Sequence, residues 1–169
     1  MKLKSKTLLI IFLIVIGCKN KAETSSQFPI YNPTRIDLTN YKKIDFNLYK
    51  LMVPTEWNEN DVEGIDSYVT QLITTDLDLI SSDLGWHSNS LDTDSKVSET
   101  TSEYYRLNNK VIKIVKPIKS GTGITGVYIK NLWKKNGEME HFNLYGIDLS
   151  EKSEKELLLV ISTIEFKEF

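Results

Sequence analysis

The chain has 169 residues, of which 26% are charged and 40% are hydrophobic, and its 21 basic and 23 acidic residues give a formal net charge of -2. A chain of this length corresponds to roughly one domain, taking about 150 residues for each. Its composition excludes a wholly disordered chain, a collagen-like repeat and a protein with several membrane spans. The charge balance also argues against a dedicated nucleic-acid-binding protein, which should be clearly basic.

Residues 1–17 have the pattern of a secretory signal peptide. Lys2, Lys4 and Lys6 precede nine consecutive apolar residues over 8–16. Nine helical residues span about 14 Å, which is half of a ~30 Å hydrocarbon core and too short for a permanent transmembrane helix. A charged start followed by a short apolar stretch therefore predicts an exported protein.

The residues Val15, Ile16, Gly17 and Cys18 resemble the lipobox of bacterial lipoproteins, in which the first three form the signal peptidase recognition sequence. The resemblance implies that the Cys18 thiol carries a diacylglycerol, that cleavage occurs before it, and that two or three acyl chains hold the protein on a membrane. A single acyl chain would hold only marginally. Cys18 is the only cysteine, so no internal disulfide can form. The alternative is an uncleaved anchor with a buried cysteine.

The predicted location is the cell envelope, with the protein anchored by lipid. In the lipoprotein class, an aspartate after the lipidated cysteine signals retention in the inner membrane, whereas here the residue is Lys19. This favours the outer membrane over the inner one, and leaves open whether the domain faces the periplasm or the surface. Removal of residues 1–17 would take away three lysines and no acid, so the net charge would fall from -2 to -5.

The remaining chain is predicted to consist of the lipidated cysteine and a flexible tether over 18–40, followed by one globular domain over 41–169. The stretch 19–40 is polar, contains Pro29 and Pro33, and shows no helical or alternating pattern. A flexible coil of that length has an end-to-end distance of about 25 Å. Alternatively, its apolar residues Phe28, Ile30 and Tyr31 dock on the domain.

The domain sequence predicts short strands joined by tight turns, and hence a largely antiparallel sheet. Asn108 and Asn109 are suited to a two-residue turn because Asn tolerates positive φ, and Asn136–Gly137 is a second hairpin signal. A polar loop is expected over 91–103, and a short helix within 55–62 is an option. The expected strands are 46–53, 66–73, 77–84, 104–107, 110–116, 127–134 and 140–145.

A C-terminal amphipathic helix is the one helix that the sequence predicts strongly. Ser150 is a good N-cap, and Glu151 and Glu154 would lie in the first turn, where the helix dipole favours acids. Apolar residues follow at helical spacing: Leu157, Val160, Ile161 and Ile164. The predicted fold class is therefore α+β, a single largely antiparallel sheet of about six to seven strands with this helix packed on it.

Three segments resemble the PsbP-like α+β fold: the strand that ends Val53-Pro54-x-x-Trp57, the middle hairpins, and the run from Leu144 into the helix that ends at Phe166. Gly64–Tyr68 and Leu84–Trp86 also resemble small bacterial lipoproteins of that type with no assigned activity. The resemblance covers about residues 41–169. It implies a binding or scaffold role more than catalysis.

No catalytic, metal-binding or cofactor site is predicted. The sequence has no G-x-S-x-G elbow, and its two histidines, His87 and His141, are 54 residues apart. The run from Gly121 to Gly126 matches G-x-G-x-x-G, but a strand pattern follows it where a dinucleotide site needs a helix. Solvated acids are numerous, and nothing selects a catalytic pair among them.

Aromatic residues are the remaining candidates, because Trp and Tyr concentrate binding energy at interfaces, although they also fill the cores of small domains. The candidate binding residues are Asp66, Tyr68, Trp86 and His87. The predicted function is that of a lipid-anchored envelope lipoprotein with a non-catalytic binding or accessory domain. The alternatives are an envelope inhibitor or immunity-type lipoprotein and a hydrolase with dispersed acidic residues. The expected partners are the membrane and an envelope protein or ligand, without nucleic acid.

Overall fold

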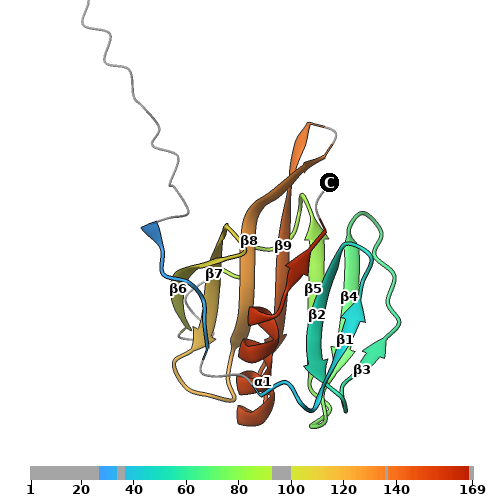
Figure 1. Ribbon diagram of the computed structural model, residues 1–169, viewed down its shortest axis with the longest axis vertical. Coiled ribbons are helices and arrows are strands. Elements are labelled where there is room, and N and C mark those ends of the chain that lie inside the picture. The colour runs from blue at the N-terminus through green and yellow to red at the C-terminus, as the bar shows by residue number, and fades with distance from the viewer. Residues whose placement is uncertain (1–26, 34–36, 93–99, 136, 168–169) are drawn as a thin grey trace, which may run out of the picture.

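A computed structural model of the chain describes residues 27–33, 37–92, 100–135 and 137–167, which contain ten strands and one helix (Figure 1). The signal sequence and Cys18 lie outside the described residues, as does most of the stretch 91–103 that was predicted to be a loop. The elements are β1 (Tyr41–Asp45), β2 (Tyr49–Pro54), β3 (Asn58–Asn60), β4 (Tyr68–Ile73), β5 (Leu79–Gly85), β6 (Thr100–Leu107), β7 (Lys110–Pro117), β8 (Ile124–Lys135), β9 (Glu138–Ile147), α1 (Glu151–Ser162) and β10 (Glu165–Phe166).

The strands form two antiparallel sheets. One has seven strands in the order β3-β4-β5-β9-β8-β7-β6, and the other has three in the order β1-β2-β10. The expected fold, a single PsbP-like sheet of six to seven strands in an α+β domain, is therefore wrong: the described chain is mostly β and contains two sheets. The predicted strand 46–53 is interrupted because Asn47 has a φ of 63° and its N–H bonds to the Asp45 side chain at 3.0 Å. The chain turns there, so β1 and β2 pair with each other as a separate hairpin.

The helix α1 begins where the sequence predicts. The Ser150 hydroxyl accepts a 3.2 Å hydrogen bond from the Ser153 N–H, which confirms the predicted N-cap. Leu157, Val160 and Ile161 are fully buried, as is Ile164 just beyond the helix, and they form the predicted apolar stripe. Within the described ranges, the structure contains no helix with the length and apolar character needed to cross a bilayer.

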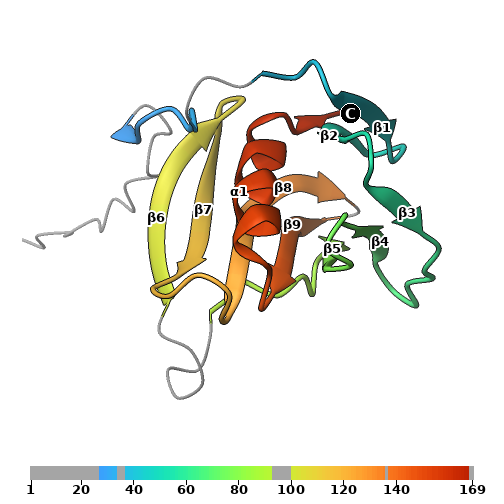
Figure 2. The same ribbon diagram turned by 90° about the horizontal axis from the view of Figure 1, so that it is seen from below.

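The core lies between the seven-stranded sheet and a second layer made of α1 and the small sheet. Figure 2 shows α1 across β8 and β9, with β1 and β2 beside it on the same side of the large sheet. Tyr49 of β2 is fully buried, and its hydroxyl lies 2.7 Å from both Thr70 of β4 and Ser82 of β5. Burial of each large apolar side chain in this layer contributes about 1.5–3 kcal/mol. The opposite face of the seven-stranded sheet carries no such layer of helix or strand in the described residues.

Both predicted hairpin connections are present, since Leu107 pairs with Lys110 and Lys135 pairs with Glu138, whereas the optional helix within 55–62 is absent. Asn108 and Asn109 both have positive φ, 47° and 63°, and join β6 to β7 as predicted. The possible helix over 55–62 is wrong: Trp57 closes a turn by donating its N–H to Pro54 at 3.0 Å, and β3 follows. β3 pairs with β4 and forms one edge of the seven-stranded sheet, so part of the segment expected to be helical is a strand.

The stretch 27–33 lies along β6. The Tyr31 N–H donates to the Arg106 carbonyl at 2.9 Å, and the Arg106 N–H donates to the Pro29 carbonyl at 2.7 Å. The Tyr31 hydroxyl donates to the Leu158 carbonyl of α1 at 3.0 Å, and burial raises the pKa of this hydroxyl. These apolar residues, which the sequence placed either in the tether or on the domain, thus contact β6 and α1.

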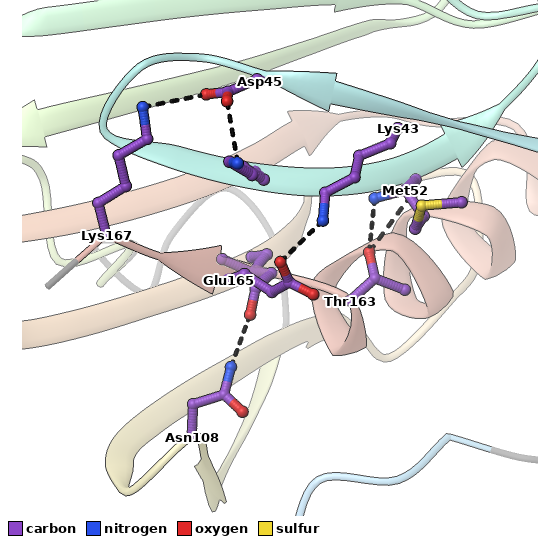
Figure 3. A network of polar contacts seen from close by, with 9 residues as sticks. Lys43, Asp45, Met52, Asn108, Thr163, Glu165 and Lys167 are labelled. Atoms are coloured by element: carbon purple, nitrogen blue, oxygen red, sulfur yellow. Dashed lines mark hydrogen bonds and ion pairs between the residues drawn. The ribbon is translucent and has the colours of Figure 1, made fainter.

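A group of polar contacts joins the small sheet to the end of α1 (Figure 3). Thr163 is the C-cap, and its hydroxyl accepts a 2.9 Å hydrogen bond from the Met52 N–H of β2. Lys43 of β1 pairs with Glu165 of β10 at 2.9 Å. Because Asn108 also donates to the Ile164 carbonyl at 2.7 Å, the turn between β6 and β7 is tied to the same corner.

Candidate binding groove

The β8–β9 hairpin extends beyond the neighbouring strands (Figure 1). Beside it, next to the start of β4 and the end of β5, lies a groove of about 720 Å³. Its walls come from the segment before β4, from β5 and Trp86, and from the outer half of the hairpin. We call it the aromatic groove. It is lined by Leu48, Ile65, Asp66, Ser67, Tyr68, Leu84, Gly85, Trp86, Trp133, Lys134, Lys135, Glu138 and Glu140.

The hairpin wall is set by a bulge in β8. The pairing of β8 with β9 is regular as far as Ile129 and resumes at Trp133 with a shifted register. Between them, Asn131 has a φ of 55°, and its N–H donates to His141 Nδ1 at 3.0 Å. A bulge increases the local twist and bends the strand, so it re-aims the side chains that follow. Trp133 and the residues beyond it thereby form a wall of the groove.

Two glycines set the opposite wall. A Cβ on Gly64 would lie 2.2 Å from the Ser67 carbonyl oxygen, and a Cβ on Gly85 would lie 2.8 Å from the Ser67 Cβ. Both distances are shorter than van der Waals contact, so the segment 64–67 packs against the end of β5 at a separation that a side chain would prevent. A side chain at either glycine would therefore displace this wall.

Each tryptophan in the groove is supported by a second aromatic ring. The Trp86 ring is half exposed and contacts the His87 ring edge-on, with centroids 4.3 Å apart at an interplanar angle of 70°. The Trp133 ring meets Phe166 of β10 at 5.9 Å and 89°. Tyr68 is partly buried, and burial raises the pKa of its hydroxyl. Edge-to-face pairs of this kind favour one ring orientation, which leaves the groove preorganised.

Charged side chains of both signs surround the aromatic rings. Asp66, Glu138 and Glu140 contribute three acids, and Lys134 and Lys135 contribute two bases. A Glu140 carboxylate oxygen lies 3.9 Å from the position that a Cβ on Gly85 would take, so this acid reaches across the end of β5. A mixed charged rim around an apolar centre is the usual anatomy of a protein interface.

The structure brings together three of the four residues that the sequence singled out. Asp66, Tyr68 and Trp86 all line the aromatic groove, whereas His87 is outside the lining and contacts it through the Trp86 ring. Of the aromatic residues outside this set, Trp57 is fully buried in the core. Tyr104 and Tyr105 belong to β6, an edge strand of the seven-stranded sheet, and do not line the groove.

Sequence reasoning missed the hairpin wall, from Lys134 to Glu140, and the exposed Ile65 on the rim. An isoleucine between Gly64 and Asp66 was a usable signal, because a large apolar side chain in a polar turn is seldom there for packing. The hairpin wall had no such signal in the sequence, since it depends on a bulge at Asn131 and no glycine marks that bulge. In the part of the chain that the structure describes, no group of three His, Cys, Asp or Glu side chains is placed to hold a metal ion.

No protein-family model matches the chain, and no curated protein matches it. Among solved structures, it is similar to a crystal structure from Bacteroides thetaiotaomicron, with 14% identity and a TM-score of 0.38 over 77% of this chain. The match covers 50% of the other chain, so this chain spans about half the length of that protein. A likeness this distant supports no conclusion about fold or function.

Proposed function

We propose that the protein is a lipid-anchored envelope lipoprotein whose domain is a non-catalytic binding module. Its partner is an envelope protein that places an apolar segment in the aromatic groove. The proposed anchor rests on the lipobox resemblance of Val15 to Cys18. The proposed binding role rests on one observation about the groove. Large apolar side chains on its rim are exposed to solvent and are not part of the hydrophobic core.

Ile65 is completely exposed and Trp86 is 50% exposed, both beside a concave surface with Tyr68 and Trp133 in its walls. Leaving a Trp or Ile in water forfeits about 1.5–3 kcal/mol of transfer free energy. Contiguous exposed apolar surface rimmed by charge marks interaction sites more often than it marks chance exposure. Aromatic anchors in preformed pockets also dominate the binding energy of interfaces.

A site-specific cross-linking experiment in intact cells tests the binding role. A photoreactive phenylalanine analogue at Ile65 is expected to give one discrete protein adduct on illumination. The matched control carries the same analogue at Ile118, which is 62% exposed on the loop between β7 and β8 at the other end of the strands. No adduct is expected there. Equal adducts at both positions would indicate random collision and contradict the proposal.

Trp86 provides the second arm of this test. Trp86→Ala in the Ile65 analogue background is expected to lower the yield of the adduct by about tenfold, which corresponds to ~1.4 kcal/mol of binding energy. The folded state of this variant is checked by its urea midpoint. An unchanged adduct yield in a folded Trp86→Ala variant would place the partner elsewhere on the surface.

The anchor is tested separately by the Cys18→Ser variant. The wild-type chain is expected to fractionate with membranes and to give a mass that includes acyl chains and lacks residues 1–17. The serine variant lacks the thiol, so it is expected to keep its N-terminal segment and to carry no lipid. A native protein that retains Met1 and an unmodified cysteine would contradict the anchor, while the cross-linking result would still decide the binding role.

A further inference from the structure

A second hollow, of about 770 Å³, lies on the face of the seven-stranded sheet that α1 leaves uncovered. Side chains alternate between the two faces of a strand. Ile112 and Ile114 of β7 are buried in the core, so Lys113 between them faces the other way. The hollow is lined by Phe28, Ser90, Asp92, Tyr104, Val111, Lys113, Tyr128 and Lys130.

Lys113 is a buried cation in the centre of this hollow. Its side chain is only 6% exposed, and its ammonium lies 2.6 Å from Asp92 Oδ1 and 5.5 Å from the centroid of the Tyr128 ring. An ammonium group has three N–H donors. Within the described residues, Asp92 is the hydrogen-bond acceptor that it meets, and the Tyr128 ring adds a cation–π contact. Lys113 can therefore donate to a further acceptor in the hollow.

The two partners of this ion pair differ sharply in exposure. The Asp92 carboxylate is 74% exposed, against 6% for the Lys113 side chain. The Lys113 bond holds the pKa of Asp92 below its usual range, so the aspartate is ionised at neutral pH. If Asp92 leaves, it returns to water that already solvates it, and it keeps its 2.6 Å bond from Ser90. Without any anion, the buried Lys113 ammonium would be left as an unpaired charge, which is costly. Another anion must therefore take the place of the Asp92 carboxylate.

We propose that this hollow binds a small aromatic carboxylate, whose carboxylate group takes the place of Asp92 at Lys113. The ring of the ligand packs beside Tyr128 and Tyr104, which flank Lys113 as its register partners on β8 and β6. Phe28 closes this side, with its ring 6.0 Å from that of Tyr104. Lys130, exposed on β8, adds a second positive charge at the rim.

The charge and size of the hollow select this class of ligand. Among the described residues, its lining has two lysines and one aspartate, so this part of the surface is locally positive in a chain whose net charge is -2. The buried ammonium of Lys113 now pairs with one carboxylate, so a ligand with a single carboxylate can replace Asp92 without changing the charge beside Lys113. The volume falls in the range of small-molecule sites, about 300–1,000 Å³.

Calorimetric titration of the full chain with 4-hydroxyphenylacetate tests the proposal, with the uncharged 4-hydroxyphenylacetamide as the matched probe. The carboxylate is expected to bind at least about tenfold more tightly than the amide, because a bond to a buried ammonium is charge-assisted. Lys113→Met is expected to remove this preference. Lys119→Met, an exposed lysine on the loop after β7, is expected to change nothing.

Asp92→Asn separates the proposal from a purely structural role of the ion pair. The asparagine cannot compete as an anion, so affinity for the carboxylate is expected to rise several-fold over wild type. Stability is expected to fall in either case, because Lys113 loses its anion, but a purely structural role would lower the affinity as well. The proposal is overturned if amide and carboxylate bind alike, if no variant binds the carboxylate, or if Asp92→Asn binds it more weakly. These results do not depend on Lys113→Met being folded.

Discussion

The Nδ1 atom of His141 accepts a 3.0 Å hydrogen bond from the backbone N–H of Asn131, across the β8–β9 hairpin. Asn131 has a φ of 55° and lies where the register of the two strands shifts, so its N–H has left the regular ladder. The imidazole supplies the acceptor that the bulge removes. This bond lies at the bulge after which β8 continues into the hairpin wall of the aromatic groove.

Replacement of His141 by Phe is expected to lower the free energy of unfolding by about 0.5–1.5 kcal/mol, because the Asn131 N–H loses its acceptor. Urea denaturation measures the loss, and hydrogen exchange at the residue 131 amide is expected to accelerate. The control is Asn131→Gly, which keeps the backbone donor and suits positive φ, and it should be as stable as wild type. An amide at 131 that remains equally protected in His141→Phe would contradict the assignment.

Thr163 is expected to matter more for stability than the ion pair beside it in Figure 3. Its hydroxyl accepts from the Met52 N–H at 2.9 Å and donates to the Val160 carbonyl at 2.7 Å. Thr163→Val leaves the part-buried Met52 donor unpaired and should cost about 1–2 kcal/mol in thermal or urea unfolding.

Two control variants distinguish this effect from a general loss of packing. Thr163→Ser keeps the hydroxyl and should stay within about 0.5 kcal/mol of wild type. Glu165→Gln breaks the pair with Lys43, whose two side chains are 49% and 63% exposed, and should also change stability by less than about 0.5 kcal/mol. A larger loss in Glu165→Gln than in Thr163→Val would reverse the expected order.

The buried Tyr49 hydroxyl is expected to make the free energy of unfolding fall in alkaline solution. Burial raises the pKa of its hydroxyl from 10.0 to about 12, against hydrogen bonds from Ser82 and Thr70 that lower it. Between pH 10 and 12 the unfolded chain releases this proton while the folded chain keeps it. The contribution of this proton to stability is therefore fully present below pH 10 and is lost as the pH rises towards 12. The total loss is about 3 kcal/mol, at about 1.4 kcal/mol for each pKa unit.

The measurement is the difference in urea stability between wild type and Tyr49→Phe, followed from pH 8 to 12. At pH 8 the phenylalanine variant should be less stable by about 1–2 kcal/mol, because the link to Thr70 and Ser82 is lost. Above pH 10 this difference in stability should shrink and then reverse, since only the wild-type chain has this proton to lose and its loss of about 3 kcal/mol exceeds the initial difference. A gap that stays constant to pH 12 would contradict the assigned titration.

The sequence was sufficient where structure is decided by neighbouring residues. The Ser150 cap, the apolar stripe of α1 and the Asn108–Asn109 turn depend on residues a few positions apart. The second sheet is different: β10 pairs Glu165 with Lys50 and Phe166 with Tyr49, more than 100 residues away. No local pattern indicates such a pairing, so the sequence predicted a single strand over 46–53 within one sheet and did not predict β1.

The two hollows differ in how far the sequence could reveal them. From the sequence, Tyr68 and Trp86 were candidate binding residues, and both lie in walls of the aromatic groove, whereas no local pattern indicated the wall that follows the bulge at Asn131. In the apolar strand around Lys113, alternation alone places the lysine on the opposite face from Ile112 and Ile114. Its partner Asp92 lies 21 residues earlier, so the ion pair itself could not be read from the pattern.

Asp83 is expected to be a site where a single substitution stabilises the fold. Its Oδ1 is buried and has no hydrogen-bond partner in the described part of the chain, although the Asp83 N–H donates to Asn143 at 3.0 Å. An unsatisfied buried polar atom costs about 1–3 kcal/mol, more when it carries charge. Asp83→Asn removes the charge at constant size, so it should raise the free energy of unfolding by about 1 kcal/mol.

Asp78→Asn is the matched comparison, because Asp78 Oδ2 accepts the Ser150 N–H at 2.9 Å at the N-terminus of α1. The helix dipole stabilises an acid there, so the same chemical change should cost about 0.3–1 kcal/mol. Urea denaturation at pH 7 and moderate salt compares the two variants directly. Equal destabilisation by both substitutions would mean that the Asp83 carboxylate has a partner, such as an ordered water, that satisfies Oδ1 in solution.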